Sequence, residues 1–249
     1  MKSTAVASRI RRFAHYAGVA LLAAAGLGVL HHATPPTRAA DEPAKPTADD
    51  ASAKPPEGAV VLFDGKDLSK WQKQGGGEPG FIAKDGYAEA HERDIETKDK
   101  YRDFKLHVEF DPELSDPKAT GEGRGNSGVY LQGRYEIQVM DSYDQKLYPG
   151  ACAAVYGQKA PDKNMAKPVG EWQSYDIEFH AAKFDGDKKV APARVTVIWN
   201  GEKVQDNVDM KGSTGGGAKE TADPGPIRLQ YHHNPVRFRN IWIMPLEEK

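Results

Sequence analysis

The residues best suited to chemistry lie in one short stretch, residues 125–141. Tyr130, Glu136 and Gln138 alternate there with apolar residues, so on paired strands they share one face of a sheet. The apolar set that faces the opposite way is Val129, Leu131, Tyr135, Ile137 and Val139. An aromatic ring can stack on a sugar, and a carboxylate and an amide can hydrogen-bond its hydroxyls. A solvated sheet face would show the same pattern.

The elements that must position these side chains are short strands. The alternation around Gly133-Arg134 predicts a hairpin with a tight turn. Residues 104–110 give the clearest half-buried strand, and Asn200-Gly201 predicts a type I′ turn between two others. Further strands are expected at 60–63, 81–88, 95–97, 172–180, 195–199, 202–204, 227–231 and 236–244. No window predicts a long amphipathic helix, so we expect an all-β fold, a two-sheet antiparallel β-sandwich of the jelly-roll type.

The N-terminal region resembles a targeting segment. Arg9, Arg11 and Arg12 precede an apolar run at residues 17–30, which is typical of a signal peptide and short for a membrane span of ~20 residues. We therefore expect residues 1–40 to be a signal peptide or an uncleaved anchor, the only contact with a membrane. Residues 41–58 are rich in proline and alanine, which predicts a disordered linker. Residues 59–249 form the folded domain, exported to the periplasm or the cell exterior.

Composition narrows the classes of function. The chain of 249 residues has a formal net charge of −2, so no strong field favours nucleic acid. Cys152 is the one cysteine, which excludes an intramolecular disulfide and a cysteine-rich zinc site. We expect Cys152 to be a small buried residue. No glycine-rich phosphate loop precedes a helix, which argues against nucleotide chemistry.

Several motifs in order resemble one known family. The opening motif is residues 61–71, Val-Leu-Phe-Asp-Gly-Lys-Asp-Leu-Ser-Lys-Trp, and the central ones are residues 126–130 and 135–141. Later ones are residues 155–157, 167–172, 199–201, 225–232 and 236–241. Over residues 60–246 the chain resembles the 3-keto-disaccharide hydrolase family. That resemblance implies a concanavalin A-like lectin/glucanase sandwich, usually in an exported bacterial protein.

The resemblance implies a particular reaction. In a 3-keto sugar the ketone acidifies the hydrogen on C2, so a base can remove it, the glycosidic oxygen can leave C1, and water can then add back. Glu136 or His232 is the expected base, and Asp141 is an acid, an orienting residue or a metal ligand. The residues expected to bind substrate are Arg124, Asn126, Tyr130, Gln138, Tyr156, Trp172 and Gln230.

Some of these residues have competing interpretations. His232 follows Arg228 and Gln230 on the polar face of its expected strand, but it could be a surface histidine beside His233. Trp172 is favoured as a core residue, because aromatic side chains on strands usually are. Glu136, Asp141 and His232 together could hold a divalent cation, with calcium or magnesium preferred to zinc.

A retaining glycosidase of the laminarinase type is not favoured. Its Glu-x-Asp-x-x-Glu pattern would fall on Glu136, Gln138 and Asp141, where the middle carboxylate is an amide. Glu136 and Asp141 would also face opposite sides of a regular strand. The sequence is also compatible with a non-catalytic carbohydrate-binding module of the cell envelope and with a structural envelope domain.

Overall fold

The computed structural model describes residues 54–113 and 118–247, all within the unit Pro43–Lys249. The signal peptide or anchor expected at 1–40, and the linker up to residue 53, lie outside the described residues. Strands dominate what is described, and the one helical element among these residues is a 3-10 turn, η1 (Gly121–Gly123). No helix in the described part of the chain is long and apolar enough to span a bilayer.

Two antiparallel sheets and one small hairpin make up the fold. The larger sheet runs β13-β12-β9-β6-β15-β4-β3, with β1 paired to β15. Its strands are β1 (Val60–Phe63), β3 (Ile82–Lys84), β4 (Tyr87–Glu89), β6 (Phe104–Asp111), β9 (Gln173–His180), β12 (Arg194–Trp199), β13 (Glu202–Asp209) and β15 (Arg237–Pro245). The second sheet runs β2-β5-β14-β7-β8. It comprises β2 (Trp71–Lys73), β5 (Ile95–Thr97), β14 (Arg228–Leu229), β7 (Ser127–Leu131) and β8 (Tyr135–Val139).

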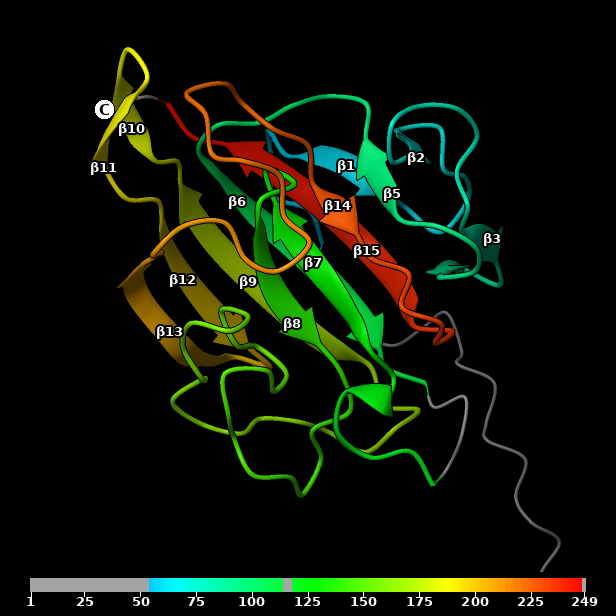
Figure 1. Cartoon of the computed structure of the whole chain (residues 1–249). Coiled ribbons are helices and arrows are strands. Elements are labelled where there is room, and N and C mark those ends of the chain that lie inside the picture. The colour runs from blue at the N-terminus through cyan, green and yellow to red at the C-terminus, as the bar shows by residue number, and fades with distance from the viewer. Residues whose placement is uncertain (1–53, 114–117, 248–249) are drawn as a thin grey trace, which may run out of the picture. The chain divides into compact units, whose positions relative to one another are not determined.

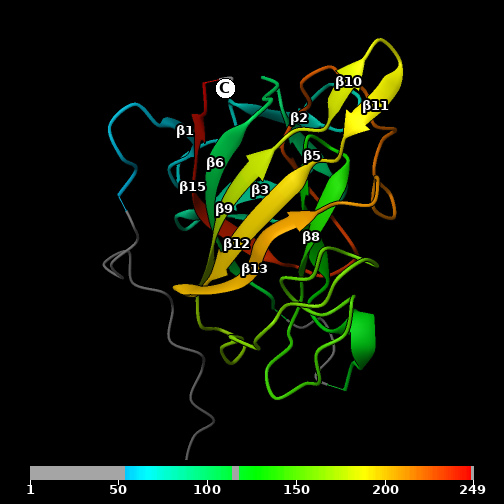
Figure 2. The ribbon, with the colours of Figure 1, turned by 90° about the vertical axis from the view of Figure 1, so that its left-hand side faces the viewer.

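The two sheets lie face to face. Figure 1 shows the β7–β8 hairpin in front of β6, β9 and β15, and Figure 2, turned by 90°, places β8 and β5 to one side of β6, β9 and β12. The inner face of β9 carries Tyr175 and Phe179, and Phe179 lies 5.5 Å, ring to ring, from Tyr135 of β8. The hydroxyl of Tyr175 donates to the Gln138 carbonyl at 2.6 Å. The predicted all-β sandwich is confirmed.

The core follows the predicted alternation. Val129, Leu131 and Ile137 are fully buried, and each such side chain contributes roughly 1.5–3 kcal/mol. Because neighbouring residues on a strand point to opposite faces, this burial forces Tyr130, Glu136 and Gln138 onto the outer face of the second sheet. Cys152 is also buried, and its Sγ lies 2.9 Å from the Tyr175 hydroxyl.

Several local predictions are corrected. The β7–β8 turn is made by Gln132 and Gly133, both with positive φ, and not by Gly133 and Arg134. The strand expected at 227–231 is shorter, because β14 covers only Arg228–Leu229, although the Gln230 backbone N–H still donates to the Gly128 carbonyl of β7 at 3.0 Å. Residues 183–191, for which no strand is predicted, form a small hairpin of β10 (Lys183–Asp185) and β11 (Lys188–Ala191). Asn200 and Gly201 both have positive φ, as a type I′ turn requires.

Candidate functional site

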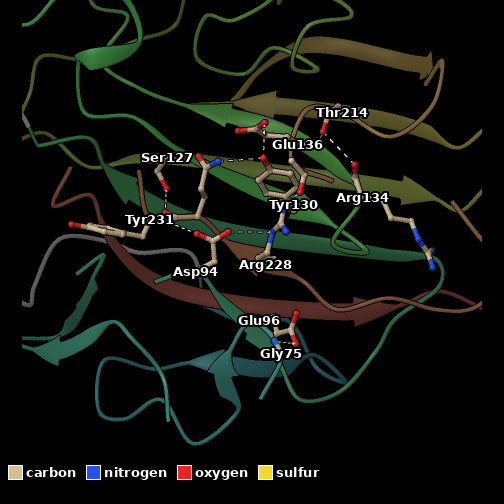
Figure 3. A network of polar contacts seen from close by, with 12 residues as sticks. Gly75, Asp94, Glu96, Ser127, Tyr130, Arg134, Glu136, Thr214, Arg228 and Tyr231 are labelled. Carbon is tan, nitrogen blue, oxygen red and sulfur yellow. Dashed lines mark hydrogen bonds and ion pairs between the residues drawn. The ribbon is translucent and has the colours of Figure 1, made fainter. Parts of the chain in front are cut away.

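Two rows of polar side chains cross the outer face of the second sheet. In the first row, Arg228, Tyr130 and Glu136 lie directly opposite one another on β14, β7 and β8. In the second row, Gln138 lies opposite Gly128, and the Gln230 backbone N–H donates to the Gly128 carbonyl at 3.0 Å. Figure 3 shows Tyr130 between Glu136 and Arg228. Because these residues are paired directly across neighbouring strands, side chains from all three strands lie next to one another.

Gly128 leaves the space in which the Glu136 carboxyl lies. A Cβ atom built on Gly128 would lie 2.3 Å from Glu136 Oε1 and 2.9 Å from its Cδ. Such distances are well inside van der Waals contact, so a side chain at residue 128 would displace the carboxyl. The glycine is required by this close approach.

The two rows form the floor of a small pocket. Its volume is about 200 Å³, and its lining residues are Glu122, Asn126, Tyr130, Glu136, Gln138, Tyr156, Gly215, Gly216, Gln230 and His232. Pockets for drug-sized ligands usually measure ~300–1,000 Å³, so this one suits a single sugar ring. Nearly every lining side chain can donate or accept a hydrogen bond, which suits a polyhydroxylated ligand.

Glu136 is the most perturbed acid in this pocket. The residue is 3 % exposed, and burial raises the pKa of its carboxyl to about 8. The hydrogen bond from Tyr130 and the charge of Arg228 lower that pKa, while the carboxylates of Glu122 and Asp94 raise it further. At neutral pH the carboxyl is therefore mostly protonated and can donate a proton.

The loop 211–226 buries Glu136 and builds one wall of the pocket. The Glu136 backbone N–H donates to Thr214 Oγ1 at 2.8 Å, and the Tyr130 hydroxyl lies 2.9 Å from both Glu136 Oε2 and the Gly215 carbonyl oxygen. Further along, the Arg134 guanidinium donates to the carbonyls of Lys219 and Asp223 and to Thr221 Oγ1. The loop is thus held in place by Tyr130 of β7, Glu136 of β8 and Arg134 of the turn between them.

Arg228 is committed to contacts other than Glu136. Its Cζ lies 3.7 Å from the centre of the Tyr130 ring, and its Nη2 donates to the Gly216 carbonyl at 2.8 Å. Its Nε is 3.6 Å from Asp94 Oδ2. This cation stabilises the floor and the wall, and its pull on the Glu136 charge is too weak to offset burial.

His232 lies at the exposed side of the pocket, next to a buried amide. Its Nδ1 is 3.4 Å from Asn126 Nδ2, and Asn126, which is 3 % exposed, has an Oδ1 without a hydrogen-bond partner. Exchanging the amide nitrogen and oxygen gives Asn126 Oδ1 the Nδ1–H of His232 as a donor. In that arrangement the imidazole Nε2 keeps its lone pair and can accept a proton.

Three predicted residues lie away from this pocket. Asp141 is buried, forms an ion pair with Arg124, and accepts a hydrogen bond from the Tyr143 backbone N–H at 3.0 Å. Neither member of the pair lines the pocket. Trp172 belongs to the other side of the sandwich, where the Arg239 guanidinium lies 4.1 Å from its ring centre.

The three residues suggested as cation ligands do not lie together. Asp141 does not join Glu136 and His232, and its carboxylate is already neutralised by Arg124. Among residues 54–113 and 118–247, no three histidine, cysteine, aspartate or glutamate side chains are gathered as a metal site would require. The described side chains therefore do not fit the suggested calcium or magnesium site.

Sequence reasoning missed Glu122, Gly215 and Gly216. Glu122 lies in η1, and both of its carboxylate oxygens accept from the Tyr156 hydroxyl, at 3.1 and 3.2 Å. Both residues line the pocket, and the Tyr156 ring lies beside the glycine wall, since a Cβ atom built on Gly215 would be 3.2 Å from Tyr156 Cε1. The flanking glycines of Glu122 indicated a turn only, and nothing in the local pattern placed that turn beside β8.

Comparisons with known proteins agree with this fold. The family model of the 3-keto-alpha-glucoside-1,2-lyase-like domain matches residues 58–244. A candidate glycosyl hydrolase from Parabacteroides distasonis ATCC 8503 is 38 % identical, with a TM-score of 0.71 over 76 % of this chain and 84 % of that one. A second from the same organism is 25 % identical, with a TM-score of 0.53 over 76 % of this chain and 99 % of that one.

No protein with a curated description matches the chain. The family model and the 38 % identical structure support a protein that acts on or binds carbohydrate, and the pocket on the second sheet offers polar side chains of the kind that sugar hydroxyls bind. The family expected from the motifs is therefore confirmed, and the chain belongs to the 3-keto-alpha-glucoside-1,2-lyase-like domain family.

Proposed function

We propose that the protein is an exported enzyme that cleaves the glycosidic bond of 3-keto-glycosides by elimination, followed by hydration. The observation that carries the proposal is the buried Glu136 carboxyl, whose pKa is about 8, in the same pocket as His232. Elimination needs a base at C2 and an acid at the leaving oxygen. A protonated carboxyl and an imidazole supply one of each.

In the first step His232 removes the proton from C2. The electrons of the C2–H bond move into an enolate, with the negative charge on the oxygen of C3. When the C3 carbonyl re-forms, a C1=C2 double bond forms and the bond from C1 to the glycosidic oxygen breaks. The leaving oxygen takes the proton of Glu136, which ends the step as a carboxylate.

The enolate oxygen needs a hydrogen-bond donor. Gln138 is 1 % exposed, and its Oε1 already accepts from the Val139 backbone N–H at 3.0 Å. That bond requires the amide oxygen to point to the Val139 N–H, so the Gln138 NH₂ group is the end of the amide that can donate to a ligand in the pocket. We assign it to the C3 oxygen, where charge develops.

Hydration returns both catalytic groups to their starting states. The Glu136 carboxylate takes a proton from water while the hydroxide oxygen bonds to C1, and protonated His232 returns a proton to C2. The product is the free 3-keto sugar. Each group acts once as acid and once as base, which is what reversal of the same chemistry requires.

The test uses the full-length protein with a 3-keto-disaccharide in D₂O. We expect release of the free sugar, transient ultraviolet absorbance from the conjugated enone, and deuterium at C2 of the keto sugar. A His232→Ala variant that still folds should lose the exchange at C2. Cleavage of the unoxidised disaccharide without exchange would refute the proposal in favour of an ordinary hydrolase, and binding without turnover would favour a carbohydrate-binding module.

Export is part of the proposal and rests on the basic and apolar N-terminal pattern of the sequence. Fusing residues 1–58 to a reporter that is active only outside the cytoplasm tests it, with Leu21 and Leu22 both changed to arginine as the control. An active reporter that the control abolishes supports export, and an inactive wild-type fusion refutes it.

A further inference from the structure

The pocket is too small for a whole disaccharide. Its volume of about 200 Å³ lies below the usual ~300 Å³ lower limit for ligand sites. If one ring occupies the pocket with C1 directed outward, the sugar on the other side of the glycosidic bond must lie on the rim. A surface that contacts this second ring would decide which glycosides are cleaved.

The rim beside Glu122 carries an exposed aromatic residue that no function yet explains. Tyr148 is 39 % exposed and Tyr143 is 42 % exposed, and they are the two aromatic residues among the large, exposed hydrophobic side chains of the described chain. Both belong to the loop 141–150. Aromatic rings left open to solvent next to a polar pocket are typical of sugar platforms.

Gly150 places Tyr148 against Glu122. A Cβ atom built on the buried Gly150 would lie 2.6 Å from Tyr148 Cε2 and 3.1 Å from Glu122 Oε1. The ring and the carboxylate therefore pack against the same backbone atom. Consistent with this closeness, the Glu122 charge contributes to raising the pKa values of both Tyr148 and Tyr156, after burial. Tyr156 also lines the pocket, so rim and pocket are continuous.

We infer that Tyr148 and Glu122 form a second subsite, which holds the leaving sugar of a disaccharide while the pocket holds the 3-keto ring. Tyr148 offers its ring for stacking, and the Glu122 carboxylate accepts hydroxyl hydrogen bonds. The inference rests on the proposed function for its choice of ligand. It assigns specificity for the leaving group to the loop 141–150 and η1, outside the two rows of the pocket floor.

The first test compares a 3-keto-disaccharide with the methyl 3-keto-glucoside, whose leaving group cannot reach the rim. In full-length Tyr148→Ala protein, the ratio of the two kcat/KM values should fall about tenfold, the effect expected for one lost stacking contact. Gly150→Ala should lower the ratio in the same direction, because the new methyl group displaces the Tyr148 ring. Tyr143→Ala, the same change at similar exposure on the same loop, should leave the ratio unaltered.

The outcomes separate the subsite from the reaction. If the wild-type protein cleaves both compounds and Tyr148→Ala keeps the wild-type ratio, the subsite is wrong and the reaction stands. If the wild-type protein cleaves neither, calorimetry with the same two compounds decides. Tighter binding of the disaccharide that is lost in Tyr148→Ala supports the subsite alone, and equal affinities refute it.

Discussion

Each sheet carries a buried glutamate with an arginine nearby on its outer face, Glu109 on the larger sheet and Glu136 on the second, and the two clusters differ in how their charges are balanced. On the larger sheet, His107 Nδ1 lies 2.7 Å from Asp176 Oδ1, and Glu109 accepts from Arg239 Nε at 2.6 Å and from Asn240 Nδ2 at 2.8 Å. On the second sheet, Glu136 accepts from the neutral Tyr130 hydroxyl.

The pKa values follow that difference. Burial by itself lowers the pKa of His107, but its bonds to Asp176 and Glu109 outweigh burial and raise it to about 9. Burial likewise raises the pKa of Glu109, but His107, Asn240 and Arg239 lower it to about 2. For Glu136 no partner outweighs burial, and its pKa rises to about 8.

The contrast supports Glu136, and not the His107 cluster, as the proton donor of the proposed reaction. His107 and Glu109 stabilise each other's charged forms, so His107 stays protonated and Glu109 stays ionised near neutral pH. Groups that keep their protonation states at working pH stabilise the fold and do not transfer protons. The Glu136 carboxyl is close to gaining or losing its proton at working pH, which is the state that acid–base catalysis needs. Burial of a glutamate alone does not distinguish the two cases, since Glu109 and Glu136 are both buried.

The largest effect is expected from Glu136→Gln. The amide keeps an acceptor for the Tyr130 hydroxyl and removes the transferable proton, so kcat/KM for a 3-keto-disaccharide should fall about 10³-fold. Urea unfolding should show unchanged or higher stability, because a group that is costly to ionise in the folded state is gone. Activity within tenfold of wild type would contradict the assignment of Glu136 as the acid.

His107→Ala should act on stability instead. It removes the cation from a buried pair and leaves Glu109 with one partner fewer, which costs about 3 kcal/mol of unfolding free energy, while kcat/KM changes less than twofold. Asp176→Asn is the matched control, because the Asp176 side chain is half exposed and its loss should cost under ~1 kcal/mol. A loss of activity in the folded His107→Ala protein would erase the distinction between the clusters.

The free energy of unfolding should depend on pH over a different range for each cluster. The pKa of His107 is higher folded, at about 9, than unfolded, at 6.5, so its stabilisation is complete below 6.5 and is lost as pH rises to about 9. The pKa of Glu136 is also raised, from 4.5 to about 8, so the folded state resists its ionisation and stability falls between those pH values. Urea titrations of the His107→Ala and Glu136→Gln variants should each lack one of these slopes.

The smallest effect is expected from Tyr130→Phe. The lost hydroxyl lowers the Glu136 pKa in the wild-type protein, so the variant's carboxyl should titrate higher. In the wild type we expect the alkaline limb of the kcat/KM profile to fall through about pH 8, and in the variant this limb should move up by at most about one pH unit. A limb that moves down, or wild-type activity that rises through pH 8, would make Glu136 the base.

Much of the site follows from the alternation in one hairpin. Val129 and Ile137 had to face the core, so Tyr130, Glu136 and Gln138 could be placed on the opposite face from sequence alone. The family motifs then added His232 and Asn126 to the same site. These residues do line one pocket.

The rest depended on contacts between distant segments. Nothing local indicated that the loop 211–226 would cover Glu136, and that cover is what raises its pKa. Asp141 follows the end of β8, where alternation stops being informative, and its pairing with Arg124 is a tertiary contact. Trp172 lies in one of the family motifs, but it immediately precedes β9 and contacts Arg239 of the larger sheet, and a motif does not state which sheet its residues lie beside.

At Gly215 and Gly216 the pocket is lined by main-chain atoms, whereas the rim beside it is formed by the side chains of Tyr148 and Glu122. The proposed subsite therefore predicts that substitutions in the loop 141–150 change the leaving-group preference without touching the hairpin, whose alternate residues serve the fold and the proposed chemistry at once. A library confined to Tyr148 and the other exposed residues of this loop should yield many folded proteins with altered substrate ranges, and one in β7 or β8 should yield mostly unfolded chains.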